Sequence, residues 1–224
     1  MYNPAALMLV SQEYISPKRT IMVRRTKEEA ARTRSRIMDA AVDVFFDRGV
    51  ANATLNEIAS QANVTRGAIY WHFKNKLDVF DALNDRLQLN FADTILADLR
   101  NDHPHPLLQL ERMCADLLID LENNLDKFKV LSILFLKSDY TGEMEPYLDL
   151  QNARKKQSIE LFSEYFARAK KHKHLLADVD TRVLSMALLS YITGIVVDYL
   201  RDPGSLVMRE HAPKFMRLFF RNLG

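Results

Sequence analysis

The chain has 224 residues, 48% of them hydrophobic, with a single Cys, six Gly and seven Pro. One Cys excludes an internal disulfide framework and a zinc site of several thiolates, and the low Gly and Pro content argues against collagen-like and turn-dense all-β chains. The net charge is only +2, but residues 1–76 carry 12 basic and 7 acidic residues, whereas residues 77–224 carry 19 and 22. A basic first third indicates an anionic partner at that end, although a basic, solvated helix without a partner has the same charge.

The first 21 residues differ from the rest of the chain. They combine Pro4 and Pro17 with a short apolar run and show no sustained helical period. A secretory signal needs a positive leading region and a longer apolar stretch before its cleavage site, and residues 1–21 show neither. Strongly patterned sequence begins at Met22. We therefore predict either that Met22 is the biological start or that residues 1–21 are a disordered leader.

From about Arg25 onward, apolar residues recur at helical spacing, and Gly49 is predicted to end the first long helix. Strand-like alternation is absent, and no stretch approaches 18 consecutive apolar residues. The sequence therefore predicts an all-α chain without a membrane span. Breaks with Pro, Gly, Asp or Asn chemistry separate the later helices, which are predicted at 76–100, 106–124, 127–140, 146–173, 179–201 and 209–222.

Residues 54–76 contain two short helices and the start of a long one. Thr54 and Glu57 have the spacing of a capping box, Thr65 can cap the second short helix, and Asn75 can cap the long one. Asn63 falls in the tight turn between the short helices, where Asn tolerates a left-handed backbone. This is helix-turn-helix spacing, in which the second helix enters the DNA major groove.

The second short helix carries side chains suited to nucleic acid. Arg66 can contact guanine with two hydrogen bonds, and Gly67 allows a close approach of the backbone. Tyr70, Trp71 and His72 can donate to phosphates, which fixes the register of the protein without reading sequence. The alternative is a helical hairpin in which the Tyr-Trp pair belongs to the core.

Two stretches, TLNEIA at 54–59 and VTRGAIYWHFKNK at 64–76, resemble the DNA-binding signature of the TetR family of transcriptional repressors. The preceding MVRRTKEEA at 22–30 resembles the AcrR-type subgroup, many of whose members control multidrug efflux operons. One departure is Asn63, where the family commonly has Gly. The resemblance implies an N-terminal three-helix DNA-binding domain at 22–75 and a larger helical effector-binding and dimerisation domain at 76–224, with about nine helices in all.

Carried over by position, the resemblance also implies functional residues. Arg66 is the expected base reader, Gly67 gives close approach, and a basic arm adds sequence-independent attraction. The expected phosphate contacts are Thr54, Thr65, Tyr70, Trp71, His72 and Lys76, and the expected arm is Arg24, Arg25, Lys27 and Arg32.

Residues 76–224 are expected to enclose an apolar cavity and to form the dimer interface of a TetR-like protein, although most such apolar stripes are plain core. An apolar or weakly polar aromatic effector is expected, because few charged groups fall on these helix faces. The expected cavity residues are Leu87, Leu110, Met113, Cys114, Leu117, Leu131, Phe135, Phe162, Leu189, Ile192 and Thr193. The expected dimer residues are Met186, Gly194, Ile195, Tyr199, Phe215 and Phe219.

Other patterns favour simpler interpretations. The two His of residues 103–106 flank a proline in a break, and the basic run at 170–174 suits a helix end. Cys114 is expected to be inert core, and no nucleophile–base pair, P-loop or dinucleotide fingerprint is present, so we expect neither an enzyme nor a cofactor. An enzyme built on His72, His103 or Cys114 is the remote alternative.

Together these features predict a cytoplasmic homodimeric repressor that binds a pseudo-palindromic double-stranded DNA operator. We expect it to control a multidrug efflux operon and to be released by a small apolar or aromatic effector. The alternatives are a TetR-like regulator of another metabolic or stress gene and a ligand-blind DNA-binding dimer, which a cavity below drug size would favour.

Overall fold

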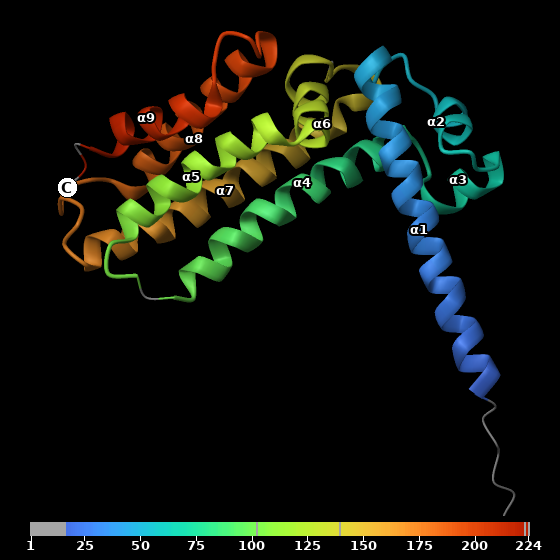
Figure 1. Ribbon diagram of the computed structural model, residues 1–224, viewed down its shortest axis with the longest axis horizontal. Coiled ribbons are helices and arrows are strands. Elements are labelled where there is room, and N and C mark those ends of the chain that lie inside the picture. Colours follow the sequence, from blue (N-terminus) through green and yellow to red (C-terminus); the bar gives the residue numbers. More distant parts are fainter. Residues whose placement is uncertain (1–16, 102, 139, 222, 224) are drawn as a thin grey trace, which may run out of the picture.

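Helices make up all the regular structure of residues 17–101, 103–138, 140–221 and 223, which are the residues that the computed structural model describes (Figure 1). The side chains of residues 17–25, 88–93 and 143 lie outside this description. The all-α prediction is confirmed. The elements are α1 (Pro17–Arg48), α2 (Leu55–Gln61), α3 (Arg66–His72), α4 (Lys76–Leu99), α5 (Pro106–Asn123), α6 (Leu125–Leu136), a 3-10 turn η1 (Gly142–Met144), α7 (Pro146–Lys171), α8 (Thr181–Arg201) and α9 (Met208–Phe220).

Helix α1 starts earlier than expected. It begins at Pro17, so residues 17–21, which the sequence assigned to the leader, are helical. Proline suits the first turn of a helix, where its missing N–H has no partner to lose. Residues 1–16 of the expected leader lie outside the described residues. At the other end α1 ends at Arg48, and the following Gly49 has a φ of 76°, so the prediction that Gly49 ends the helix is confirmed.

Helix α6 ends at Leu136, four residues before its expected end. Side chains that follow the helix satisfy its last carbonyls: Ser138 donates to the Ile133 carbonyl at 2.6 Å, and Tyr140 donates to the Leu134 carbonyl at 2.6 Å. The apolar pattern continues past Leu136, but these hydrogen bonds replace those of a further helical turn.

One apolar core joins helices α1 to α3, the predicted DNA-binding segment, to the helices that follow them. Ile37 and Phe45 of α1 are fully buried, as is Ile58 of α2. They belong to one cluster with Phe80 of α4 and Ile133 of α6. The packing is thus continuous across residue 76, because α4 and α6 complete the core around α1 to α3.

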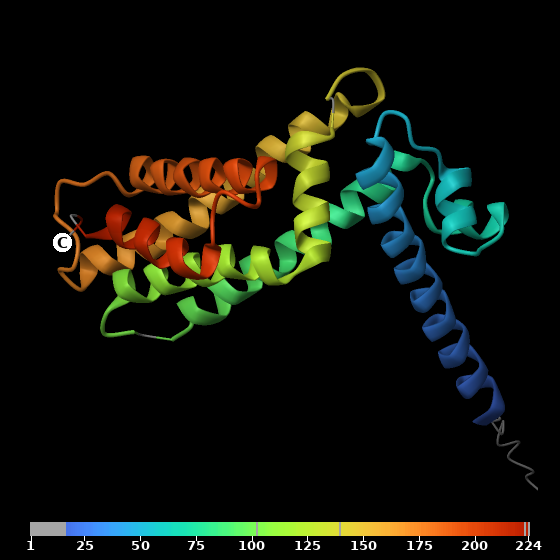
Figure 2. The same ribbon diagram turned by 45° about the horizontal axis from the view of Figure 1, so that its top comes forward.

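A second core lies between the end of α4 and helices α5, α7, α8 and α9. Here α5 packs along α9 and α7 packs along α8, while α1 extends away from this body (Figures 1 and 2). Helix α8 is long and apolar enough, by length and composition alone, to cross a membrane. In the described part of the chain its inner face packs against α6 and α7. The α2–α3 unit and the second core thus lie at opposite ends of α4.

Candidate nucleic-acid interface and effector cavity

The start of α2 is fixed by the predicted capping box. The Glu57 backbone N–H donates to the Thr54 hydroxyl at 3.2 Å, and the Thr54 N–H donates to the Glu57 carboxylate at 2.9 Å. Hydrogen bonds from the Thr54 side chain and backbone lower the pKa of Glu57, and Arg48 adds to the effect. Thr54 is exposed, so its hydroxyl lies at the surface while it caps the helix.

The turn between α2 and α3 has the predicted conformation. Asn63 has a φ of 51°, which confirms that Asn replaces Gly in a left-handed position. Thr65 caps α3 by accepting from the Ala68 N–H at 3.2 Å. Ile69, on the inner face of α3, is fully buried in the first core. These contacts fix the orientation of α3 and direct its remaining side chains outward.

The outward face of α3 gathers the predicted contact residues. Arg66 and Gly67 are exposed, Tyr70 is 45% exposed and Trp71 is 72% exposed. The Arg66 guanidinium lies 5.6 Å from the centre of the Tyr70 ring. The alternative that the Tyr-Trp pair belongs to the core is therefore wrong. Their exposure leaves polar and aromatic groups available to a partner.

His72 lies at the end of this face and is half-buried. Its ring packs edge-on against Trp71, with the centroids 4.5 Å apart. Burial lowers its pKa below the usual 6.5, and the positive charge of Arg34 lowers it further. The ring is therefore neutral at pH 7, and one of its two nitrogens is an N–H donor.

The other predicted DNA contacts have different surroundings. The Lys76 ammonium donates to the Ala51 carbonyl at 2.8 Å and so ties the start of α4 to the loop before α2. Lys27 and Arg32 are exposed on α1. The side chains of Arg24 and Arg25 lie outside the described residues, although both positions belong to α1.

Two further arginines of α1 support the α2–α3 unit, and the sequence analysis missed them. Arg36 donates to the carbonyls of Ala62 and Asn63, at 3.3 and 3.2 Å, in the turn itself. The Arg34 guanidinium lies 4.9 Å from the centre of the Phe73 ring, at the end of α3. The only sequence signal is their i, i+2 spacing in a basic stretch, which equally fits a DNA-contacting arm.

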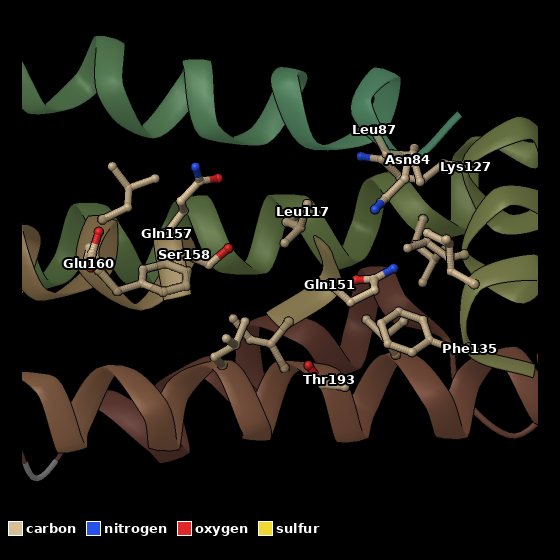
Figure 3. Close-up of a pocket in the computed structure, with 18 of the residues that line it drawn as sticks. Asn84, Leu87, Leu117, Lys127, Phe135, Gln151, Gln157, Ser158, Glu160 and Thr193 are labelled. Atoms are coloured by element: carbon tan, nitrogen blue, oxygen red, sulfur yellow. The ribbon is translucent and has the colours of Figure 1, made fainter. Parts of the chain in front are cut away.

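A cavity of about 540 Å³ lies between helices α4 to α8 (Figure 3). This volume falls within the range of small-molecule sites, about 300–1,000 Å³. It is not below drug size, which favours an effector over a ligand-blind protein. Eight of the eleven predicted residues line it: Leu87, Leu117, Leu131, Phe135, Phe162, Leu189, Ile192 and Thr193.

Three predicted cavity residues do not line it. Leu110 and Cys114 are completely buried in the second core, where α5 packs against α9. Met113 lies one turn along α5 from Leu110, with its sulfur 3.7 Å from the Tyr165 hydroxyl. Helix α5 is apolar on more than one face, so the sequence could not separate its core-facing residues from Leu117. Burial also strongly raises the pKa of the Cys114 thiol, which keeps it unreactive.

The cavity wall also has a polar part, which the apolar helical spacing did not predict. Asn84 and Lys127 lie at one end of the cavity, beside the predicted Leu87, and Gln157 and Glu160 lie at the other (Figure 3). The remaining polar side chains of the wall are Tyr140, Gln151, Ser158 and Glu164, besides Thr193. The available signal was a polar residue at a position where helical spacing calls for an apolar one, as at Asn84 between Leu83 and Leu87.

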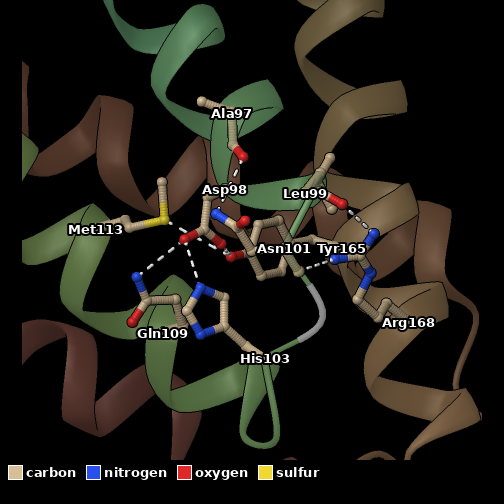
Figure 4. A network of polar contacts seen from close by, with 9 residues as sticks. All are labelled: Ala97, Asp98, Leu99, Asn101, His103, Gln109, Met113, Tyr165 and Arg168. Atoms are coloured by element: carbon tan, nitrogen blue, oxygen red, sulfur yellow. Dashed lines mark hydrogen bonds and ion pairs between the residues drawn. The ribbon is translucent and has the colours of Figure 1, made fainter.

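In the break between α4 and α5, which contains His103 and His105, one carboxylate accepts several hydrogen bonds. Asp98 accepts from His103 Nε2 at 2.9 Å, from Gln109 Nε2 at 3.1 Å and from the Tyr165 hydroxyl (Figure 4). This cluster joins the end of α4 to α5 and α7. Within the described residues, no group of three or more His, Cys, Asp or Glu side chains has an arrangement that holds a metal ion.

The outer face of α8 and α9 carries several of the predicted dimer residues. Met186 is 47% exposed, Gly194 is exposed, and Phe215 and Phe219 are half-buried. Val183 and Leu218, at 61% and 59% exposure, extend the apolar surface of the same two helices.

Two other predicted dimer residues face inward. Ile195 and Tyr199 are only 8% and 6% exposed, because they belong to the second core of their own chain. The Tyr199 ring packs edge-on against Phe128 of α6. Both were assigned to the interface because α8 is apolar nearly all round, so its pattern does not separate the inner face from the outer one.

This geometry agrees with the comparisons with known proteins. The chain matches the family described as bacterial regulatory proteins, tetR family, over residues 37–83, and the C-terminal region of MAATS-type transcriptional repressors over residues 105–224. It is 32% identical over 201 residues to the HTH-type transcriptional repressor BepR of Brucella suis, an alignment that covers 90% of this chain and 96% of BepR.

Two solved structures are also similar. Native NalD, the secondary repressor of the MexAB-OprM multidrug efflux pump in Pseudomonas aeruginosa, has a TM-score of 0.79 at 31% identity and covers 87% of this chain and 98% of its own. The complex of SmeT with triclosan has a TM-score of 0.75 at 26% identity, with coverages of 83% and 90%. SmeT is the repressor of the Stenotrophomonas maltophilia efflux pump SmeDEF. The chain belongs to the TetR family of bacterial transcriptional regulators.

Proposed function

We propose that this protein is an effector-responsive repressor that binds a DNA operator as a homodimer and releases it when a small molecule fills the cavity. The observation that carries the proposal is the pairing, in one chain, of the exposed face of α3 with a 540 Å³ cavity. On α3, Arg66 reads a base while Tyr70, Trp71 and the capping threonines contact phosphates. Lys27, with Arg24 and Arg25, adds sequence-independent attraction.

The dimer is proposed to form through the outer face of α8 and α9. Val183, Met186 and Leu218 expose large apolar side chains there, which a second copy of the chain would cover. A Cβ at Gly194 would meet nothing within 4 Å, so the partner helix has room to approach. A two-fold dimer presents two α3 helices to half-sites about one helical turn of DNA apart, roughly 34–36 Å, or a multiple of it.

The effector is proposed to be an apolar or aromatic molecule with a few polar groups. The wall combines Leu, Ile and Phe side chains with amide and hydroxyl groups of Asn84, Gln151 and Ser158. Apolar walls with a few convergent polar groups are typical of drug-sized sites. Triclosan, a chlorinated phenol found with SmeT, is therefore a suitable probe.

The regulated gene is proposed to encode a multidrug efflux pump. NalD and SmeT are described as repressors of such pumps, and both are similar to this chain over most of its length. The protein would act in the cytoplasm, where its DNA lies.

The test begins by mapping the DNA that the protein binds in its own genome and then measures binding to the recovered site by fluorescence anisotropy. We expect a pseudo-palindromic site beside an efflux operon, with an affinity at least about 10³-fold above that for random DNA. Saturating triclosan should weaken binding to this site by about 5–150-fold. Tight triclosan binding with no change in DNA affinity would contradict effector release, and a recovered site beside an unrelated operon would contradict the efflux assignment.

A further inference from the structure

The cavity wall contains one polar side chain that is almost completely buried. Asn84 on α4 is only 2% exposed and lies at the end of the cavity near α6 (Figure 3). Its amide nitrogen donates to the Tyr147 hydroxyl on α7. The amide keeps a second N–H, but among the described residues nothing donates to its carbonyl oxygen, so this oxygen is the acceptor that the side chain offers to a bound molecule. An oxygen acceptor in an apolar wall selects molecules with a hydrogen-bond donor, such as a phenol.

Tyr147 carries the contact away from the cavity. Its hydroxyl also accepts from Arg154 Nη1 at 3.1 Å. The side chain is 1% exposed, and its ring packs edge-on against Phe80, 4.5 Å between centroids, in the core shared with α1 to α3. Burial raises the pKa of the Tyr147 hydroxyl, and the positive charge of Arg154 opposes this only in part, so the group stays neutral.

Arg154 ties α7 to the first half of α4. Its side chain is 8% exposed, and it donates to the carboxylates of Asp81 and Asp85, which lie one turn apart on α4. Burial alone would lower the pKa of Arg154, but the hydrogen bonds to both carboxylates raise it overall. A buried cation is costly unless its partners are in place, so this contact has few alternative geometries.

The opposite end of α4 is held separately. Besides the hydrogen bonds to Asp98, Arg168 of α7 donates to the carbonyls of Leu99 and Asn101, the latter at 2.6 Å (Figure 4). Near the DNA-binding segment, Arg86 of α4 pairs with Asp39 of α1 at 2.6 Å. Because the far end of α4 is held in place, a change in the contacts of Asp81 and Asp85 should move the end of α4 that packs against α1 to α3.

We propose that Asn84, Tyr147 and Arg154 form a relay that couples a hydrogen-bond-donating effector to the position of the DNA-binding segment. The donor group of the effector donates a hydrogen bond to the Asn84 carbonyl oxygen. The Asn84 side chain rotates, and the hydrogen bond from its amide to the Tyr147 hydroxyl breaks. Tyr147 and Arg154 then rearrange, and the ion pairs that Arg154 of α7 makes with Asp81 and Asp85 change. The relay rests on the proposed function, because it needs both an operator and an effector. The free energy that the relay can contribute to operator release is set by how much more tightly the effector binds the rearranged contacts than the original ones.

The test measures the coupling factor, which is the operator affinity without triclosan divided by that with saturating triclosan. Tyr147→Phe keeps the buried ring and removes only the hydroxyl. We expect the factor to fall about fivefold relative to the wild type, while operator affinity without triclosan changes less than about threefold. Tyr199→Phe, which removes the hydroxyl of another buried tyrosine outside the relay and the cavity, should leave the factor unchanged.

The outcomes separate the relay from the proposed function. A Tyr147→Phe factor equal to that of the wild type overturns the relay and leaves the repressor standing. A wild type that binds its operator but ignores triclosan overturns the effector part of the proposed function, and the relay with it. Should Tyr147→Phe fail to fold, Arg154→Lys replaces it. The lysine keeps a positive charge beside Asp81 and Asp85 but lacks the second guanidinium nitrogen that donates to Tyr147. We therefore expect the same fivefold fall in the coupling factor.

A second measurement changes the ligand instead of the protein. The methyl ether of triclosan keeps its shape but has no donor for the Asn84 carbonyl. At saturation with the wild type, it should give the reduced coupling factor of Tyr147→Phe, and it should give no further reduction with that variant. Equal factors for the phenol and the ether in the wild type would overturn the relay.

Discussion

In the α2–α3 unit, each helix start is fixed by a capping threonine that bonds to the residue three positions later, and the predicted DNA-contacting groups point outward into solvent. In the cavity, the wall comes from five helices, and its buried Asn84 is held by Tyr147, 63 residues away. Next to this wall, Arg154 is held by Asp85, 69 residues away. The first arrangement presents a rigid, preformed surface, since the caps, the buried Ile69 and the contacts of Arg36 with the turn orient it. The second depends on the relative position of whole helices, which is what a small molecule can change.

The two regions also differ in how they treat charge. Around α3, Arg66 and Lys27 are exposed, where a charge is well solvated and available to a phosphate. Between α4 and α7, Arg154 is buried and needs both of its carboxylates. Substitutions should therefore change DNA affinity in the first region and stability or coupling in the second.

The largest expected effect comes from removing the buried cation. Arg154→Met leaves the Tyr147 hydroxyl and two carboxylates without their partner, so we expect a loss of about 2–4 kcal/mol in the free energy of unfolding, measured with urea. Arg86→Met breaks the exposed pair with Asp39 and should cost less than about 1 kcal/mol. Equal losses for the two variants would contradict the distinction between the buried and the surface contact.

The next effect concerns base reading. Arg66→Ala should lower discrimination between operator and random DNA by about 1–3 kcal/mol and leave the fold intact, because the side chain is exposed and no buried partner depends on it. Anisotropy titrations with both DNAs, beside a thermal melt, measure this. An unchanged ratio of the two affinities would refute the base-reading role.

A smaller effect separates support from direct contact on α1. Arg36→Ala should weaken operator binding by about 0.5–1.5 kcal/mol without changing the salt dependence, because Arg36 holds the Ala62 and Asn63 carbonyls. Lys27→Ala, the matched exposed position, should reduce the slope of log affinity against log salt by about 1. A reduced slope for Arg36→Ala would reassign that residue to phosphate contact.

The smallest effect is on pH dependence. In the free protein burial and then Arg34 lower the pKa of His72, whereas a nearby phosphate favours the protonated ring. DNA binding is then coupled to the uptake of a proton by His72. Operator affinity should therefore rise about threefold as the pH falls from 7.5 to 6.5, and this gain should disappear as the pH is raised again. His72→Gln should flatten this part of the profile, and a wild-type profile that is already flat would remove His72 from the contact.

The amino-acid sequence by itself determined the local features. Capping residues and the left-handed Asn63 and Gly49 follow from side chains within one or two turns, because caps and turns are short-range hydrogen bonds. The same reasoning located most helix ends of residues 76–224. It also found most of the apolar cavity wall, because that wall follows helical periodicity.

Only the tertiary structure decided which face of each apolar helix met which neighbour. Helices α5 and α8 are apolar on several faces, so Cys114 and Tyr199 could equally have lined the cavity or the dimer surface, and packing against α9 and α6 buries them instead. The Arg154 contacts escape a sequence pattern for a related reason: a buried ion pair joins residues about 70 positions apart, and no local period records it. Short-range bonds are encoded in neighbouring residues, whereas burial is a property of the assembled helices.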